Sequence, residues 1–532
     1  MNAAVHPVEK AAVPPAPLPH PLLGVTAIMV GVAVSTLTSR LTSVGLADIR
    51  GAVGAGFDEG AWITTAFTAA QMLVGPSCVW FGLVHGIRNL LLLGCVLFGV
   101  AEFLIPWAPH LSLVLALQFI AGLGSGVFIP LTIGIVFRGL PQKLWVYGIA
   151  AYAMNIVLSL NVAATIEGWY SEHASWHWLF WQNAVLAVPL FALFWFALPA
   201  ERTNRQMQKV GDHTGIALMS VGLALIFAAL DQGDRLDWWN SQLIVLLALA
   251  GIGFVGLFLV HESFLTHTGV DFSLLARRNI VFFVLFVVLI RYLVTSSNLL
   301  TTNFLVQVRG LRPLQAGEAL LWLALPQFLV APAVAWLLTR IDPRIVIATG
   351  VGVTTVAFVM LSQLTSAWSE SSFAGLLLLQ AMGETAALIA MIYFLTRHLA
   401  LSPLVFLGIG AFLQTARLFG GELGTAAITV FTRKFEQINS NLVGLHVGAD
   451  APATIERLRL YATQVGAAQD GGIADGRILG LLANAVRTQA FTLAYADGFA
   501  IAAGVAMCAL LIAFLMRDPP PQPPAPVAPP PR

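Results

Sequence analysis

Charged and amide side chains stand inside long apolar runs of this chain, and their types and spacing could do chemistry. Arg40 lies in "VSTLTSRLTSVGLADIRG", Arg291 in "VVLIRYLVTSSNLL" and Glu384 in "LQAMGETAALIAM". Gln414 and Arg417 share "GAFLQTARLFGGELG" and are three residues apart, so they lie on one face of a helix. A charge at membrane depth is costly and is therefore a functional-site hypothesis by default.

Glu384 is the first candidate for carrying a coupling proton, and Glu422 is the second. A carboxyl group in an apolar cavity favours its neutral form, so it can load and release a proton near neutral pH. The alternative for Glu384 is a fixed salt bridge with Arg291 or Arg417 that only holds helices together. The alternative for Glu422 is a helix-end charge near the outer membrane surface.

The arginines and amides are candidates for holding a substrate. Arg40 could donate charge-assisted hydrogen bonds to the carboxylate of an anionic substrate. Its alternative is an ion pair near the outer end of the helix, with Glu102 or with the turn at Asp48. The alternative for the amides is hydrogen bonding that only joins helices. The predicted substrate-binding residues are Arg40, Gln118, Asn155, Asn161, Arg291, Gln414 and Arg417.

The composition indicates which elements must position these residues. The chain has 532 residues, of which 58% are hydrophobic and 10% charged, whereas a soluble protein carries about 25% charged residues. Apolar runs of about 18 residues or more, long enough to span a bilayer as helices, recur throughout. We therefore predict an all-α polytopic membrane protein. The net charge of +1 argues against a nucleic-acid partner.

Other chemistries lack their signatures in the sequence. No glycine-rich phosphate loop followed by lysine is present, so ATP drive is not expected. The three cysteines follow neither a metal-binding nor a disulfide spacing. No catalytic constellation, paired-histidine zinc motif or cofactor motif is found, and we expect a protein that is not an enzyme and needs no metal or cofactor.

Fourteen spans are predicted, with Pro-rich cytosolic segments at 1–21 and 517–532. Lys and Arg concentrate in alternate short loops, which places both termini in the cytoplasm. The long loop at 432–494 then lies outside. Its apolar spacing predicts amphipathic helical pieces, packed as a small cap or left as a flexible connector. The predicted spans are 22–47, 61–84, 89–107, 111–137, 144–166, 176–198, 213–231, 241–261, 279–305, 315–338, 344–364, 371–396, 402–431 and 495–516.

Several segments, in order, resemble one transporter family. They include "DEGAWITTAFTAAQM", "SWHWLFWQNAVLAVPL", "LIFAALDQGDRLDWWNSQLI" and "GLRPLQAGEALLWLALPQFLVAPAVAWLLTRIDPR". From about 25 to 516 the chain resembles the major facilitator superfamily in its fourteen-span drug:proton antiporter branch, the EmrB/QacA type. The resemblance implies a major facilitator fold. Two six-helix bundles, at 22–198 and 279–516, would surround a central cavity. Two extra helices at 199–278 would join them.

The resemblance also implies a function. It implies proton-coupled efflux of amphipathic small organic molecules across the inner membrane by alternating access. The arginines at Arg40 and Arg291 extend this expectation to anionic substrates. A separate periplasmic adaptor and an outer-membrane channel are implied partners, beside the substrate, protons and the lipid bilayer. The spans that hold Arg40 and Arg291 correspond to cavity-lining helices of the family.

The family motifs are degenerate in this chain. Leu83 stands at the usual aspartate of the loop after the second span, and Gln118 replaces the usual arginine of the fourth. The fifth-span segment "AATIEG" keeps only Gly168, and the first-span aspartate aligns with Thr38. Two other interpretations therefore stay open: an importer or facilitator of the same fold, and a membrane scaffold or sensor that transports nothing.

Overall fold

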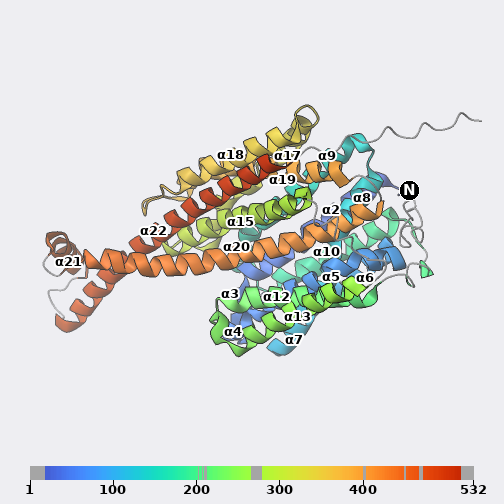
Figure 1. The fold of residues 1–532 in the computed structure, drawn as a ribbon. Coiled ribbons are helices and arrows are strands. Elements are labelled where there is room, and N and C mark those ends of the chain that lie inside the picture. The colour runs from blue at the N-terminus through green and yellow to red at the C-terminus, as the bar shows by residue number, and fades with distance from the viewer. Residues whose placement is uncertain are drawn as a thin grey trace, which may run out of the picture.

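The computed structural model describes residues 18–201, 203–205, 208, 212–264, 278–399, 403–448, 451–465 and 471–516. These residues form α-helices, short 3-10 helices and connecting turns, with no strand among them. The helices run roughly along one long axis (Figure 1). Residues 1–17 of the predicted N-terminal arm and all of the predicted tail at 517–532 lie outside the described residues.

The first bundle contains six predicted spans. Gly122 lets two of its helices approach closely, because a Cβ there would lie 2.2 Å from the backbone oxygen of Phe67. The fourth span is divided at Gly126, after the small-residue run that includes Gly122 and Gly124. The helices are α2 (Pro21–Val44), α5 (Trp62–His85), α6 (Ile87–Leu104), α7 (Leu111–Ser125), α8 (Phe128–Gly139), α9 (Trp145–His173) and α10 (Trp178–Ala197), with the short α3 (Leu46–Val53) and α4 (Phe57–Gly60) between α2 and α5.

Two linker helices join the bundles, as predicted. They are α12 (His213–Gly233) and α13 (Gln242–Phe264). The Asp212 side chain caps α12 by accepting a hydrogen bond from the Gly215 backbone nitrogen at 3.0 Å, which satisfies one free donor of the first turn. The helix α12 packs against α13 and α5.

The second bundle carries the remaining helices. The predicted span 315–338 is divided into two helices at Pro326, because proline lacks the backbone donor that a continuous helix needs. Gly168 of α9 packs against the start of this divided span, where a Cβ would lie 2.7 Å from Leu314 Cα. The helices are α15 (Arg278–Gln307), α16 (Pro313–Ala324), α17 (Gln327–Leu338), α18 (Pro343–Leu361), α19 (Glu370–Leu399), α20 (Pro403–Leu445), α21 (Pro452–Val465) and α22 (Gly471–Leu515).

The segment 432–494 differs from the prediction of a loop. Instead of ending near 431 and restarting near 495, α20 and α22 continue as helices through most of this segment. They project from the body as a helical hairpin with α21 at its far end, rather than folding back as a cap (Figure 1). Asn439 donates to Asp497 Oδ2 at 3.5 Å, and Arg487 lies 4.0 Å from Glu436. These contacts favour continuous paired helices.

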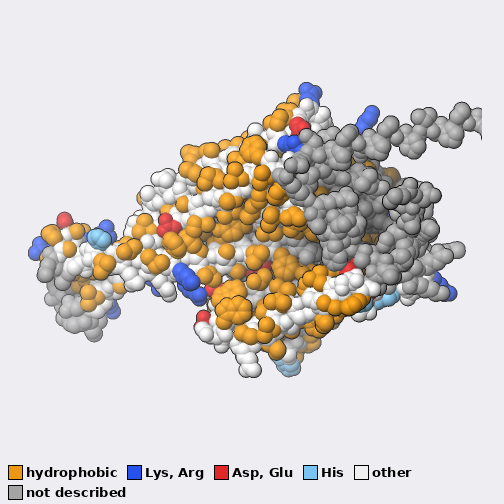
Figure 2. Space-filling model, viewed as in Figure 1, with side chains coloured by type: hydrophobic (Ala, Val, Ile, Leu, Met, Phe, Trp, Pro, Cys, Tyr) orange, Lys and Arg blue, Asp and Glu red, His pale blue; other side chains and the backbone are white. Residues whose placement is uncertain are grey.

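Thirteen helices among the described residues are long and apolar enough to cross a membrane. The predicted span 402–431 lies in α20, which runs beside α15 and α22; a fourteenth crossing stays a prediction. Apolar side chains cover much of the visible flank of the body, while several charged groups lie toward its ends and on the hairpin (Figure 2). Such an apolar flank suits a lipid environment.

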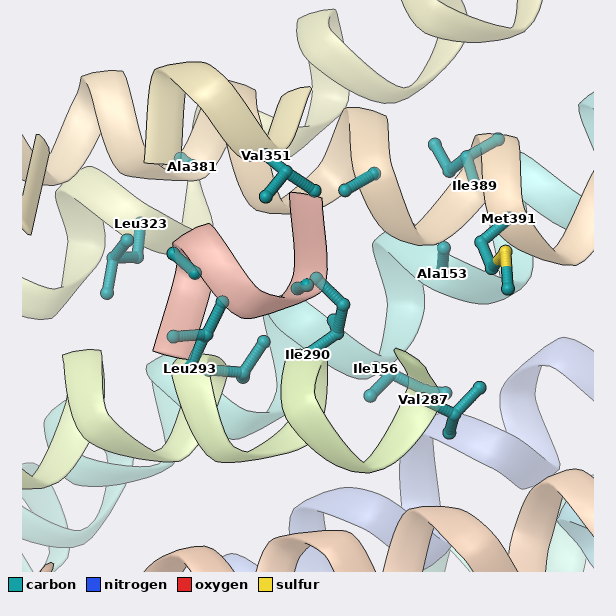
Figure 3. Close-up of a cluster of buried hydrophobic side chains, with 14 of the residues drawn as sticks. Ala153, Ile156, Val287, Ile290, Leu293, Leu323, Val351, Ala381, Ile389 and Met391 are labelled. Atoms are coloured by element: carbon teal, nitrogen blue, oxygen red, sulfur yellow. The ribbon is translucent and has the colours of Figure 1, made fainter. Parts of the chain in front are cut away.

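The hydrophobic packing does not stop at the boundary between the bundles. Ala153 and Ile156 of α9 belong to the same buried cluster as Val287 and Ile290 of α15 and Met391 of α19 (Figure 3). The first bundle has a second cluster of its own, which includes Phe98 and Phe128. The helix α9 therefore packs into the second bundle, and the polar side chains of the site interrupt this shared interface.

Candidate substrate and proton site

A hydrogen-bond network crosses the interface between the two bundles. The Arg40 guanidinium on α2 donates to Asn298 Oδ1 on α15. Asn298 Nδ2 in turn donates to Asn161 Oδ1 on α9 at 3.0 Å. Arg40 forms no salt bridge with Glu102 or Asp48 among the described residues, so the alternative of an ion pair with either acid is not seen. Arg40 instead binds a neutral amide on the opposite bundle.

Glu384 of α19 contacts α15 at Ser297, the residue before Asn298 of this network. Its Oε1 accepts hydrogen bonds from Ser297 Oγ at 2.7 Å and from Gln380 Nε2 at 2.9 Å. Gln380 also donates to Ser297, and the Glu384 side chain is buried. Arg291 acts on Glu384 electrostatically. Within the part of the chain that the structure describes, however, no salt bridge joins Glu384 to Arg291 or Arg417.

Arg417 is buried and Arg291 is partly buried, and neither forms a salt bridge with a carboxylate within the described residues. Arg417 Nε of α20 donates to Gln414 Oε1 at 3.0 Å, as their spacing on one helical face predicted. Arg291 interacts electrostatically with Arg417, and both interact with Tyr152 of α9. The buried Nε of Arg291 has no hydrogen-bond partner among the described residues. Two like charges in an apolar interface repel each other, and a bound anion would relieve that repulsion.

Glycine in "FGGELG" makes room for one of these arginines. A Cβ at Gly421 would lie 3.2 Å from Arg291 Nη2, and a Cβ at Gly420 would lie 3.0 Å from Arg291 Cβ. The close approach of α20 to α15 therefore depends on these small residues. A side chain at either position would press on Arg291 or move the helix.

Three predicted site residues lie apart from the residues described above around Arg40, Glu384 and Arg417. Asn155 Nδ2 donates to the Met29 backbone oxygen at 2.5 Å, which joins α9 to α2 within the first bundle. Gln118 is buried in α7, and neither of its amide atoms has a partner among the described residues. Glu422 is hydrogen-bonded to Asp231 of α12, so it is not a solvated charge at a helix end.

Four residues of the group were missed in the sequence. Ser297 and Asn298 stand in "VVLIRYLVTSSNLL", where the four adjacent polar residues "TSSN" in an apolar run were a signal that could have found them. Gln380 precedes Glu384 by one helical turn and so shares its face. Tyr152 gave no signal, because an aromatic residue inside an apolar span is ordinary.

A small cavity lies beside Tyr152, the residue with which both arginines interact. This cavity offers about 10 Å³ for water centres, roughly enough for one water molecule, and Thr132, Val136 and Ile392 are among its lining residues. A drug-sized substrate needs several hundred Å³. A drug-sized substrate therefore does not fit this cavity in the arrangement seen here.

The family model described as Major Facilitator Superfamily matches residues 28–421. The chain belongs to this superfamily. The resemblance read from the sequence is thereby confirmed, and so is the all-α membrane fold. Membership also classes the chain with transporters rather than enzymes.

Curated relatives agree with the EmrB-type branch. The chain is 24% identical over 335 residues to probable multidrug resistance protein EmrY of Escherichia coli, covering 62% of this chain and 65% of that protein. It is 26% identical over 359 residues to multidrug export protein EmrB of Haemophilus influenzae, covering 66% and 69%. The aligned part of the chain thus spans about two thirds of these relatives. Fatty acid resistance protein FarB of Neisseria gonorrhoeae is 23% identical over 518 residues, which cover 94% of this chain and 98% of that protein.

A solved structure has the same fold. The crystal structure of the human organic anion transporter MFSD10 (TETRAN) matches with a TM-score of 0.54 and 14% sequence identity. The match covers 93% of this chain and all of that one. At this identity the likeness concerns the fold alone.

Proposed function

We propose that this chain is a proton-coupled efflux transporter of amphipathic small organic molecules, anionic ones included, and that it works by alternating access. One observation carries the proposal: Glu384 is buried and is held by neutral donors rather than by a salt bridge, and one of these donors, Ser297, precedes Asn298 at the contact between the bundles. A carboxyl group held in this way is free to change its charge during a transport cycle. The name of the EmrB relative, a multidrug export protein, supports export as the direction.

The hydrogen bonds of Glu384 connect it, through Ser297 and Asn298 of α15, to residues of the first bundle. Ser297 and Gln380 donate to its carboxylate oxygen. When Glu384 gains a proton, it becomes a weaker acceptor, and these two donors lose part of their interaction. Because Ser297 precedes Asn298 in α15, a shift there reaches the Asn298 contact with Arg40 and Asn161. Protonation would thereby change the relative stability of two bundle arrangements.

The arginine pair supports anionic substrates. Arg291 and Arg417 interact electrostatically, and neither forms a salt bridge with a carboxylate among the described residues. Guanidinium groups bind carboxylates in a planar, two-bond geometry, which a hydrophobic acid offers at one end. The relative FarB is named for resistance to fatty acids, which are amphipathic acids. Asn161, Gln414 and Arg40 would line the same opening when the bundles part.

Location and partners belong to the same proposal. The charge bias of the loops supports an inner-membrane protein with both termini in the cytoplasm and the α20–α22 hairpin outside. The hairpin exposes Leu445 and Leu460, at 80% and 57% of their surface. Exposed apolar side chains on a projecting hairpin favour contact with another protein. A separate periplasmic adaptor, continued by an outer-membrane channel, suits this position.

Dye efflux from loaded cells tests the transport proposal. A panel of hydrophobic and anionic dyes is compared with and without an uncoupler for wild type, Glu384→Gln and Glu318→Gln. Glu318 is an exposed carboxylate on α16 and serves as the matched control. We expect uncoupler-sensitive efflux in wild type and Glu318→Gln, and none in Glu384→Gln at normal protein levels.

Other outcomes distinguish the competing interpretations. Efflux equal to that of empty-vector cells for every dye would favour the scaffold or sensor. Dye accumulation in place of efflux, checked by the direction of flux in inverted vesicles, would favour an importer or facilitator. Equal uncoupler-sensitive efflux in all three proteins would remove Glu384 from the proton path.

The adaptor proposal has its own test. Leu445→Ser combined with Leu460→Ser removes two exposed apolar side chains without touching the buried core. We expect efflux from whole cells to fall, while transport by the purified protein in proteoliposomes stays at the wild-type level. Full efflux from cells by the double variant would contradict a role of these residues in adaptor binding.

A further inference from the structure

A second group of acids lies outside the site described above, where the linker helix α12 meets both bundles. Asp231 near the end of α12 and Glu422 of α20 are hydrogen-bonded to each other through their side chains. Thr65 of α5 donates to Asp231 Oδ2. Gln232 donates to Thr65 and lies 3.4 Å from the same Asp231 oxygen. One contact thus ties together α5, α12 and α20, which belong to the first bundle, the linker and the second bundle.

A hydrogen bond between two carboxyl groups requires a proton on one of them. With that proton, one group donates and the other accepts; without it, two carboxylates face each other and repel. The two groups then titrate as a pair rather than singly. We propose that Asp231 and Glu422 share one proton and form a latch that holds α12 against α20 and opens when the proton leaves to water.

The charged neighbours of the pair are all at the same end of the molecule. Arg235 interacts electrostatically with Asp231, and its Nε lies 3.8 Å from Asp58 Oδ1. Asp234 is bound by Arg433 of α20 at 2.9 Å. Arg50 also acts on Arg235.

These neighbours stabilise one ionised carboxylate but not two. Burial lowers the pKa of Arg235, while Asp231 and Asp58 act against that shift, and an arginine remains charged at physiological pH. Arg235 is shared between Asp231 and Asp58, and Arg433 is engaged by Asp234. The loss of the shared proton therefore leaves a net repulsion between α12 and α20.

The latch deepens the proposed function and rests on it for its role in transport. The outer ends of α5 and α20 must separate for the cavity to open outward, and the protonated pair holds them through α12. Proton release would permit that opening. The existence of the latch itself does not depend on Glu384 or on any substrate.

Distance measurement between spin labels on the purified full chain in lipid nanodiscs tests the latch. The labels are placed at Gln242→Cys, at the start of α13, and at Gln437→Cys on α20; both positions are exposed. Cys508→Ser removes the exposed native thiol, and the two buried cysteines stay. Distances are compared at about pH 5 and about pH 9, a range that spans ordinary and buried carboxyl groups.

We expect a short, narrow distance distribution at acidic pH and a shift to longer or broader distances at alkaline pH in the wild-type background. Glu422→Gln should keep the short distance at both pH values, because its amide can donate to Asp231 as the shared proton does. Asp231→Asn should also keep the short distance at both pH values, because its amide can donate to Glu422. Glu436→Gln, a matched substitution on the same helix whose acid lies 4.0 Å from Arg487, should keep the wild-type shift.

Three results would overturn the latch: an unchanged wild-type distance across the pH range, a wild-type shift retained in Glu422→Gln or Asp231→Asn, or a shift abolished by Glu436→Gln. No transport is measured in this experiment. Failure of the latch would therefore leave the Glu384 proposal intact, and failure of Glu384 in efflux would leave the latch intact.

Discussion

Glu102 in the first bundle and Glu384 in the second are both buried in their helices, and the two are held differently. Glu102 of α6 accepts a hydrogen bond from Asn183 of α10 at 3.0 Å, and both helices belong to the first bundle. Its second oxygen has no partner among the described residues. Glu384 has two donors on one oxygen, and one of them, Ser297, precedes Asn298 at the contact between the bundles. Burial alone therefore does not distinguish a proton-carrying acid from a structural one. We distinguish them by whether a hydrogen-bonded neighbour lies at the contact between the bundles.

The largest expected effect separates these two acids. Glu384→Gln should lower uncoupler-sensitive efflux at least about tenfold, equal to about 1.4 kcal/mol, because the amide cannot exchange a proton. Glu102→Gln should retain most of the efflux, since the hydrogen bonds that the structure gives its partner Asn183 lead only to residues of the first bundle, Glu102 and Leu179. Initial efflux rates at matched protein levels measure both. Equal loss in the two variants would mean that burial, not position, decides function.

The next effect concerns the arginine pair. Arg417→Lys keeps the charge but loses the planar two-bond geometry that carboxylates prefer. We expect the KM of anionic substrates to rise about tenfold, equal to about 1.4 kcal/mol, with neutral substrates little changed. Competition between an anionic and a neutral dye measures the difference. A parallel loss for both dyes would assign Arg417 to structure rather than to substrate charge.

A smaller effect compares two asparagine contacts of the helices that line the interface. Asn298→Ala leaves the Arg40 guanidinium without its acceptor, which should cost about 1 to 3 kcal/mol. Asn155→Ala removes a bond within the first bundle to the Met29 backbone oxygen, so it should cost about 1 kcal/mol. Thermal unfolding of the purified variants measures both. A larger loss for Asn155→Ala would reverse the ranking of the two contacts.

The smallest effect lies on the hairpin. The Arg487–Glu436 pair is 4.0 Å long, and Arg487 is largely exposed. Exposed pairs contribute about 0 to 1 kcal/mol, so Arg487→Ala should change the unfolding temperature little. A large drop would mean that this contact, rather than helix packing, holds α20 against α22.

The sequence predicted the fold well because its signal is strong and local. Long apolar runs bounded by charged turns can only be membrane helices, and the order of family-like segments added the arrangement of bundles. The segment 432–494 was harder, because amphipathic spacing indicates helices but not that they continue the spans. Pro326 and Gly126 divide spans that hydropathy alone would draw as continuous.

The candidate site was predicted in part. Gln414 and Arg417 were paired by their spacing, and Glu384 stood out by its charge. The partner of Arg40 could not be found, because Asn298 is 258 residues away and only the fold brings it near. The same holds for Asp231 and Glu422. Local patterns identify which residues are unusual, while long-range packing decides which of them meet.

Proton release on substrate binding tests the central claim most directly. The purified protein in weakly buffered solution is mixed with a dye that it exports, and a pH indicator counts the protons released. Wild type and Glu102→Gln should release protons on binding, and Glu384→Gln should release none while still binding the dye. Equal release by Glu384→Gln and wild type would contradict the assignment of the coupling proton to Glu384.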